Sequence, residues 1–197
     1  MDKKPTKDRI IESALTLFSE KGYDGVGVDL IAETAGLKGP SIYKHFKGKE
    51  EVLEVILERV EEHYEMNFGS KLHTGNIPAS MEELVKGALK RIEFTMHDEM
   101  IQKTRRILTM EQFRNPKIAG LATKYNIEGN QGLYQVIFEK MMESGAMKKG
   151  DARMMAMAFT APITLLIQRY DREPECEKEI MKQIKAYFKA FAATYGN

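Results

Sequence analysis

The chain has 197 residues, a formal net charge of +1 and 43% hydrophobic residues, a share that supports a real core and excludes a disordered chain. No apolar run approaches the roughly 18 uncharged residues that span a bilayer, and the charged N-terminal segment is unlike a secretory signal, so we expect no membrane association. The single cysteine, Cys176, cannot form an internal disulfide, which agrees with a reducing, cytoplasmic location.

Helical periodicity continues along almost the whole chain and strand patterns are essentially absent, so we predict an all-α fold. The first predicted helix covers residues 7–22 and stops at Gly22. A second helix takes Asp29 as its N-cap and ends at Gly36, a residue that suits the left-handed conformation common at that position.

A much shorter helix follows, and then a long one. Gly39 suits the N-cap of the short helix and Pro40 its first position, where the missing N–H is not needed. This helix ends near Phe46. The long amphipathic helix covers residues 49–67 and turns its glutamates toward water, and a loop rich in Gly, Ser, Asn and Pro at 69–80 interrupts the pattern.

The remainder of the chain is predicted to form six more helices. Pro162 falls inside the fifth of these and is expected to kink it, because proline removes one backbone hydrogen bond. We predict a small N-terminal domain at 1–48 and a larger domain at 49–197 that begins with the long helix. The six later helices cover residues 80–96, 98–113, 117–125, 128–144, 151–170 and 174–193.

The short helix has the two faces expected of a recognition element. Ile42 and Phe46, four residues apart, form an inward face that anchors it on its neighbour. No carboxylate lies between positions 34 and 49, so the surroundings are cationic, as phosphates require. Two short helices joined by a glycine turn form a helix-turn-helix motif, whose second helix enters the major groove of DNA. Its outward side chains are those of Ser41, Tyr43, Lys44 and His45.

The stretch from residue 9 to residue 53 resembles the N-terminal domain of the tetracycline-repressor (TetR) family of transcriptional regulators. The likeness combines residue types with their spacing. Two positions depart from the usual pattern: Gly27 stands where the family generally has Thr or Ser, and Pro40 stands where Gly is common. The matching residues are Ile10, Ala14, Leu15, Phe18, Gly22, Tyr23, the run 31–37, Ser41, Ile42, Tyr43, His45, Phe46, Lys49, Glu50, Val52 and Leu53.

The resemblance implies three short helices that bind DNA, a linking helix, and a divergent C-terminal domain that binds a ligand and dimerises through its last two helices. It implies that Tyr43 and Lys49 contact DNA phosphates. Other residues are implied to lie at or near the groove, namely Lys38, Gly39, Ser41, Lys44 and His45.

Methionine is frequent in the larger domain, where aromatic side chains accompany it. Met fills irregular space and adapts to varied partners, so ordinary core packing and an adaptable apolar cavity between helices both remain open. The resemblance favours a cavity for a small hydrophobic effector. The residues that we assign to this effector pocket are Phe94, His97, Met100, Met110, Phe113, Tyr134, Phe138, Met142 and Phe159.

The last two helices carry more apolar surface than two terminal helices of a monomer should show. Packing within one chain is the simpler interpretation, and a two-fold four-helix interface between two chains is the stronger one. Small residues permit close approach of the helices there. The residues predicted at this homodimer interface are Ala158, Ala161, Leu165, Ile184, Tyr187, Phe188 and Phe191.

An enzyme is the weakest alternative. The chain has no phosphate-cradling glycine loop and no nucleophile elbow, and the pair His97-Asp98 lacks the further ligands that a metal site needs. We therefore predict no catalytic residues, no metal and no cofactor.

These observations predict a dimeric repressor that binds a palindromic DNA operator and is released by a small hydrophobic effector. Two recognition helices must stand about 34 Å apart to enter successive major grooves, and a ligand that tilts the linking helix would alter that separation. The alternative is a helical carrier or scaffold for small molecules that does not bind an operator.

Overall fold

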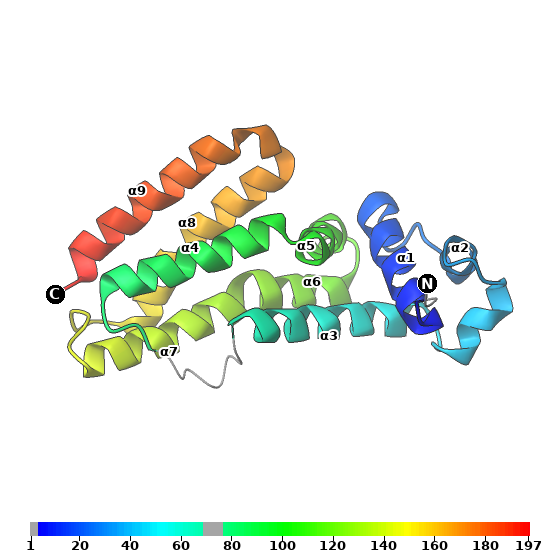
Figure 1. The fold of residues 1–197 in the computed structure, drawn as a ribbon, viewed down its shortest axis with the longest axis horizontal. Coiled ribbons are helices and arrows are strands. Elements are labelled where there is room, and N and C mark those ends of the chain that lie inside the picture. Colours follow the sequence, from blue (N-terminus) through cyan, green and yellow to red (C-terminus); the bar gives the residue numbers. More distant parts are fainter. Residues whose placement is uncertain (1–3, 69–76) are drawn as a thin grey trace. The chain divides into compact units, whose positions relative to one another are not determined.

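The computed structural model describes residues 4–68 and 77–197, and in those residues the chain is built from helices (Figure 1). The one strand-like feature of the described residues is an isolated antiparallel bridge between Met147 and Gly196. The predicted all-α fold is confirmed. The predicted loop at 69–80 lies largely outside the described residues.

The helices group into two compact units, each with its own buried core. The first unit contains residues 1–67 and 99–120, and the second contains residues 68–98 and 121–197. This grouping follows packing and places two later helices beside the N-terminal ones. The functional division predicted between residues 48 and 49 stays a prediction.

The first unit is formed by α1 (Thr6–Lys21), α2 (Val28–Thr34), the 3-10 helix η1 (Gly39–Lys44), α3 (Lys49–Phe68), α5 (Glu99–Glu111) and most of α6 (Pro116–Thr123). The second unit is formed by α4 (Met81–His97), the π-helical turn η2 (Lys124–Glu128), α7 (Gly129–Glu143), α8 (Ala152–Arg172), the 3-10 turn η3 (Pro174–Cys176) and α9 (Glu177–Tyr195). Within the first unit, α1 packs against both α2 and α5, and α2 packs against η1.

Two predicted helix starts in the first unit differ from the structure. Helix α2 begins at Val28 with Gly27 as its N-cap, and no side chain caps it, so the prediction that Asp29 is the N-cap was wrong. Asp29 lies in the first turn, where its carboxylate still interacts favourably with the helix dipole. The short helix starts at Gly39 instead of being capped by it, with Lys38 as N-cap.

The recognition element is a 3-10 helix of six residues, tighter than the α-helix that the pattern suggested. The amide of Ser41 donates to the carbonyl of Lys38 at 2.8 Å, and the amide of His45 donates to the carbonyl of Ile42 at 2.9 Å, both three residues back. Only Phe46 closes an α-type turn, donating to Ile42 at 3.0 Å. Short elements of this kind adopt 3-10 geometry readily, and neighbouring helices must hold them.

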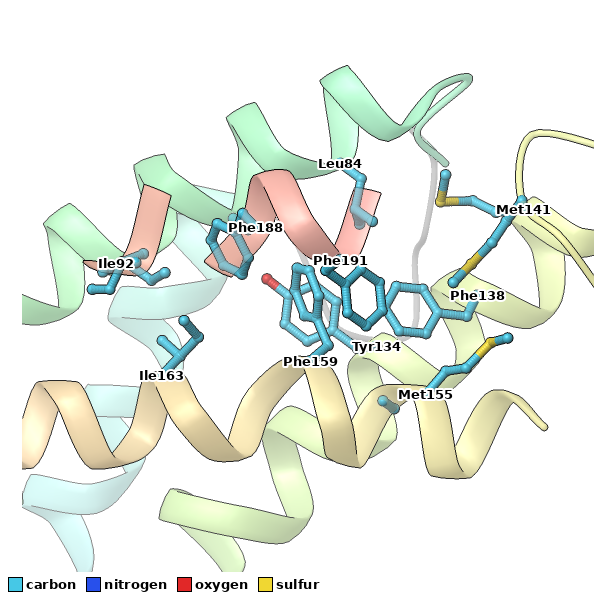
Figure 2. Close-up of a cluster of buried hydrophobic side chains, with 14 of the residues drawn as sticks. Leu84, Ile92, Tyr134, Phe138, Met141, Met155, Phe159, Ile163, Phe188 and Phe191 are labelled. Atoms are coloured by element: carbon cyan, nitrogen blue, oxygen red, sulfur yellow. The ribbon is translucent and has the colours of Figure 1, made fainter. Parts of the chain in front are cut away.

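The core of the second unit is an aromatic cluster contributed by α7, α8 and α9 (Figure 2). The ring of Phe159 stacks on Phe188 with centroids 4.7 Å apart, and meets Phe191 edge-on at 4.8 Å. Phe138 closes the other side at 5.4 Å from Phe159. Helices α7 and α8 pack along each other, so this cluster fixes the unit.

Pro162 lies inside α8, as predicted, and its effect on the backbone is compensated from α9. Proline has no N–H, so it cannot donate to the carbonyl of Ala158, four residues earlier. The hydroxyl of Tyr187 donates to that carbonyl instead. Burial raises the pKa of Tyr187, so the hydroxyl keeps its proton at neutral pH.

Replacing Tyr187 by Phe should lower the free energy of unfolding by about 1–2 kcal/mol, because the Ala158 carbonyl loses the hydroxyl that donates to it. Tyr195→Phe is the matched control, because it also removes one tyrosine hydroxyl from a ring that packs on Phe191, and it should change stability by less than about 0.5 kcal/mol. Urea unfolding measures both variants. Equal effects of the two substitutions would contradict this role for Tyr187.

Candidate DNA-binding site

The recognition helix η1 turns one face inward and leaves the other face in solvent. The side chains of Ile42 and Phe46 are fully buried, so they anchor the helix. On the opposite face Tyr43 is 58% exposed, an unusual position for an aromatic ring. Lys44 and His45 are exposed beside it, and Lys38 is exposed just before the helix. The structure thus brings these residues to one surface.

The start of η1 lies very close to α2, and this explains the glycine there. A Cβ atom on Gly39 would stand 2.5 Å from the carboxylate oxygen Oδ1 of Asp29, which is closer than non-bonded atoms approach. A side chain at position 39 would therefore require the Asp29 carboxylate or η1 to move. Gly39 therefore acts through its backbone, whereas its half-buried neighbour Ser41 retains a side chain that can reach outward.

Arg9 of α1 holds the turn between α2 and η1. Gly36 adopts a left-handed conformation with φ of +68°. The Arg9 guanidinium donates to the carbonyl of Ala35 and, at 3.4 Å, to that of Gly36, so it satisfies carbonyls left without partners at the end of α2. The sequence did not indicate this role, because the bond joins residues far apart in the chain.

Lys49, at the start of α3, lies inside the unit instead of standing free for DNA. Its ammonium donates to the carbonyls of Tyr23 at 2.9 Å and Val26 at 3.3 Å, and it stands 4.4 Å from the centre of the Tyr23 ring. Burial, and then the negative charge of Glu50, raise the pKa of Tyr23. Lys49 fixes the turn before α2, and its predicted phosphate contact stays a prediction.

The residues predicted to line an effector pocket are divided between the two units. Met100, Met110 and Phe113 belong to the first unit, and Phe113 is 91% exposed. The other six belong to the second unit, where three pack in the aromatic cluster with ring centroids 4.6–5.9 Å apart, namely Tyr134, Phe138 and Phe159 (Figure 2).

The three remaining pocket candidates are not part of the ring stack. Phe94 meets the Phe68 ring edge-on at 5.2 Å, and Met142 packs at the margin of the core. His97 is exposed and its Nε2 lies 3.1 Å from a carboxylate oxygen of Glu177. It borders a groove of about 530 Å³ that is more polar than predicted and is lined by Glu93, His97, Glu177, Lys178, Met181, Lys182 and Lys185.

The residues predicted at a dimer interface divide into two groups. Ile184, Phe188 and Phe191 are buried in the core of their own chain, so they offer no exposed surface to a partner. Tyr187 bonds within the chain to half-buried Ala158. The sequence could not separate these positions from interface positions, because both share the apolar periodicity of a helix. Two of the predicted interface residues, Ala161 and Leu165, remain exposed on the outer face of α8.

Helices in the described residues are all too short or too polar to cross a membrane. Within residues 4–68 and 77–197, no group of three His, Cys, Asp or Glu side chains could hold a metal ion.

Three helices at the N-terminus, with an exposed basic and aromatic face on the last of them, define a DNA-binding protein of the helix-turn-helix class. Residues 10–56 match the profile of the family described as bacterial regulatory proteins, tetR family. The biofilm operon icaADBC HTH-type negative transcriptional regulator IcaR of Staphylococcus epidermidis is 30% identical over 151 residues, which cover 60% of this chain and 82% of that protein. The chain belongs to the TetR family.

Other relatives and structures agree with this assignment. IcaR of Staphylococcus aureus is 52% identical over 48 residues, which are 24% of this chain and 26% of that protein. A TetR-family transcriptional regulator from Mesorhizobium loti shares the fold with a TM-score of 0.71 and 25% identity, over 98% of this chain and 97% of that one. SmeT of Stenotrophomonas maltophilia, in a complex with triclosan, superimposes with a TM-score of 0.80 and 19% identity, over 98% and 92% of the two chains.

Lys49→Ala should lower the free energy of unfolding by about 1.5–3 kcal/mol, because the partly buried carbonyls of Tyr23 and Val26 lose a charged hydrogen-bond donor. Lys44→Ala, at an exposed position in the same motif, should change stability by less than about 0.5 kcal/mol. Denaturant unfolding compares the two variants. If the stability of Lys49→Ala equalled that of Lys44→Ala, the positioning role of Lys49 would be wrong.

Proposed function

We propose that the protein is a repressor that binds a palindromic DNA operator as a homodimer and leaves it when a small hydrophobic effector binds. The exposed face of η1 is the observation that carries the proposal, since it combines an unburied Tyr ring with cationic side chains. Membership of a family of bacterial regulators favours this function over the alternative of a helical carrier.

The proposed DNA contacts follow from what each side chain can donate. The hydroxyl of Tyr43 and the ammonium of Lys38 suit phosphate oxygens, which position the protein without reading sequence. Ser41, Lys44 and His45 can reach base edges in the major groove, where such donors discriminate base pairs. Gly39 would let the backbone approach closely.

The proposed homodimer uses the outer face of α8. Met154, Met157, Ala161 and Leu165 recur at three- and four-residue spacing, and Leu165 is 66% exposed. An exposed apolar row of this kind on a helix indicates an interface, and a two-fold pairing of α8 and α9 would bury it. The proposed dimer interface is therefore limited to residues of the last two helices that stay exposed in a single chain.

The proposed effector site is in the second unit, close to the aromatic cluster. Tyr134 carries a hydroxyl on a ring that packs against Phe159, and burial raises the pKa of this hydroxyl to about 12, so it stays protonated and can donate to a ligand. The structure of SmeT, the repressor of a multidrug efflux pump, with triclosan makes a small aromatic compound a reasonable first probe. Such a ligand must part the rings to enter.

Release of DNA requires the effector to bind better to the conformation that cannot bind DNA. The two recognition helices of a dimer must be spaced to enter successive major grooves, about 34 Å apart. We propose that effector binding reorients α3, the predicted linking helix, and so changes that spacing.

The wild-type protein should bind its own promoter DNA as a dimer, with affinity that falls steeply as salt is raised, because phosphate contacts release counterions. Fluorescence anisotropy at several salt concentrations, with an unrelated duplex of equal length, measures both affinity and preference. An affinity that is equal for the two duplexes at every salt concentration would favour the carrier.

Leu165→Arg is the matching test of the dimer, because it places a charge in the exposed apolar row of α8. Ile127→Arg, on η2, is its control at another exposed apolar position. Light scattering should find Leu165→Arg monomeric and operator binding lost, with the control dimeric and active. A dimeric, active Leu165→Arg protein would place the interface elsewhere.

Triclosan should raise the Tm of the wild-type protein by mass action and weaken its operator complex. Tyr134→Phe should bind triclosan about fivefold to tenfold more weakly, because it removes one hydrogen-bond donor and leaves the ring. Phe113→Ala, at an exposed site in the other unit, is the control and should bind normally. Unaltered affinity in Tyr134→Phe would remove Tyr134 from the site.

A further inference from the structure

A carboxylate is buried beside the helix-turn-helix motif, where neither the resemblance nor the predicted DNA contacts account for it. Glu111, the last residue of α5, is only 2% exposed. Its Oε1 accepts a hydrogen bond from the backbone N–H of Tyr23 at 2.9 Å. Its Oε2 is buried and has no hydrogen-bond partner among the described residues. Burying a carboxylate with one oxygen unsatisfied lowers the stability of the fold. A role in function would account for the carboxylate of Glu111 at Tyr23.

The turn after α1 is shaped to admit this carboxylate. Gly22 ends α1 in a left-handed conformation with φ of +79°. A Cβ atom at position 22 would lie 2.5 Å from Oε1 of Glu111, so any other residue would displace the carboxylate. Gly22 therefore serves both the reversal of the chain and the approach of α5.

Tyr23 is consequently held through both of its backbone polar groups. Glu111 binds its N–H, while the ammonium of Lys49 binds its C=O at 2.9 Å and also reaches the carbonyl of Val26. The ring of Tyr23 packs against Phe18 with centroids 5.1 Å apart. These contacts fix the segment that leads directly into α2, the helix on which η1 rests.

We infer that Glu111 is a positioning residue for DNA binding: from α5 it holds the turn that orients α2 and η1. The inference rests on the proposed function and adds to it a residue through which the position of α5 affects DNA binding. Helix α5 packs on α1, and Ile107 and Leu108 are buried in the turn of α5 that precedes Glu111. A shift of α5 along α1 stretches the bond from Glu111 to Tyr23 and frees the turn, so the position of α5 influences how the recognition helix is presented.

Three variants separate positioning from packing. Glu111→Ala removes the acceptor, Glu111→Gln keeps a carbonyl oxygen at Oε1, and Leu108→Ala disturbs the packing of α5 on α1 without touching the bond to Tyr23. Two measurements apply to all of them: hydrogen exchange of the Tyr23 amide by NMR without DNA, and the Kd for promoter DNA well below the Tm.

Glu111→Ala should speed exchange of the Tyr23 amide at least about tenfold and weaken operator binding about tenfold, the effect of losing one hydrogen bond to a charged group. Glu111→Gln should restore protection and keep the Kd within about threefold. Leu108→Ala should lower the Tm yet leave both readouts near wild type. If Glu111→Ala does not fold, Glu111→Asp, whose shorter side chain draws the carboxylate back, replaces it in the same comparison.

The outcomes distinguish this inference from the proposed function. A wild-type protein that binds no operator refutes the proposed repressor. Hydrogen exchange of the Tyr23 amide would still test the hydrogen bond to Glu111. A Glu111→Ala protein with an exposed Tyr23 amide and wild-type Kd overturns the positioning role and leaves the repressor intact. An equal loss of affinity in Leu108→Ala would also overturn it, because packing alone would then explain the effect.

Discussion

The surface that we propose to contact DNA depends on the burial of two side chains, Ile42 and Phe46, beneath a helix of only six residues. A 3-10 helix of this length has too few hydrogen bonds to persist alone, so tertiary packing must supply its stability. The same two anchors determine which residues face outward. Because Tyr43 and its cationic neighbours lie opposite the anchors, a change that loosens the anchors also disorders the face that we propose to contact DNA.

The turns on both sides of α2 are held by charged side chains that work inside the protein. Arg9 binds the carbonyls at the end of α2, and Lys49 binds those before its start, while Glu111 binds the amide of Tyr23. Each of these groups satisfies backbone atoms in the turns that flank α2. A count of basic residues near the motif therefore overstates the charge available to phosphates, since two of them already have partners.

In the second unit, too, the sequence pattern does not reveal where a side chain makes its contacts. Helices α8 and α9 are apolar over much of their surface, and the pattern favoured a dimer interface. Most of that surface is covered within the chain, where Phe159, Phe188 and Phe191 stack, and where Tyr187 compensates for Pro162. The apolar row of α8 that includes Leu165 stays exposed. A helix that buries a face in its own core has the same periodicity as one that buries it in a partner.

The sequence by itself determined the all-α fold, the helix boundaries to within a few residues, the end of the first helix at Gly22, the left-handed Gly36, and the two faces of the short helix. These depend on local preferences and on periodicities of a few residues, which a linear chain displays directly. Only the tertiary structure decided that Lys49 points inward, that the pocket candidates divide between two units, and that Glu111 meets Tyr23. Each of these joins positions far apart in the chain, and no local spacing encodes which distant group a side chain will reach.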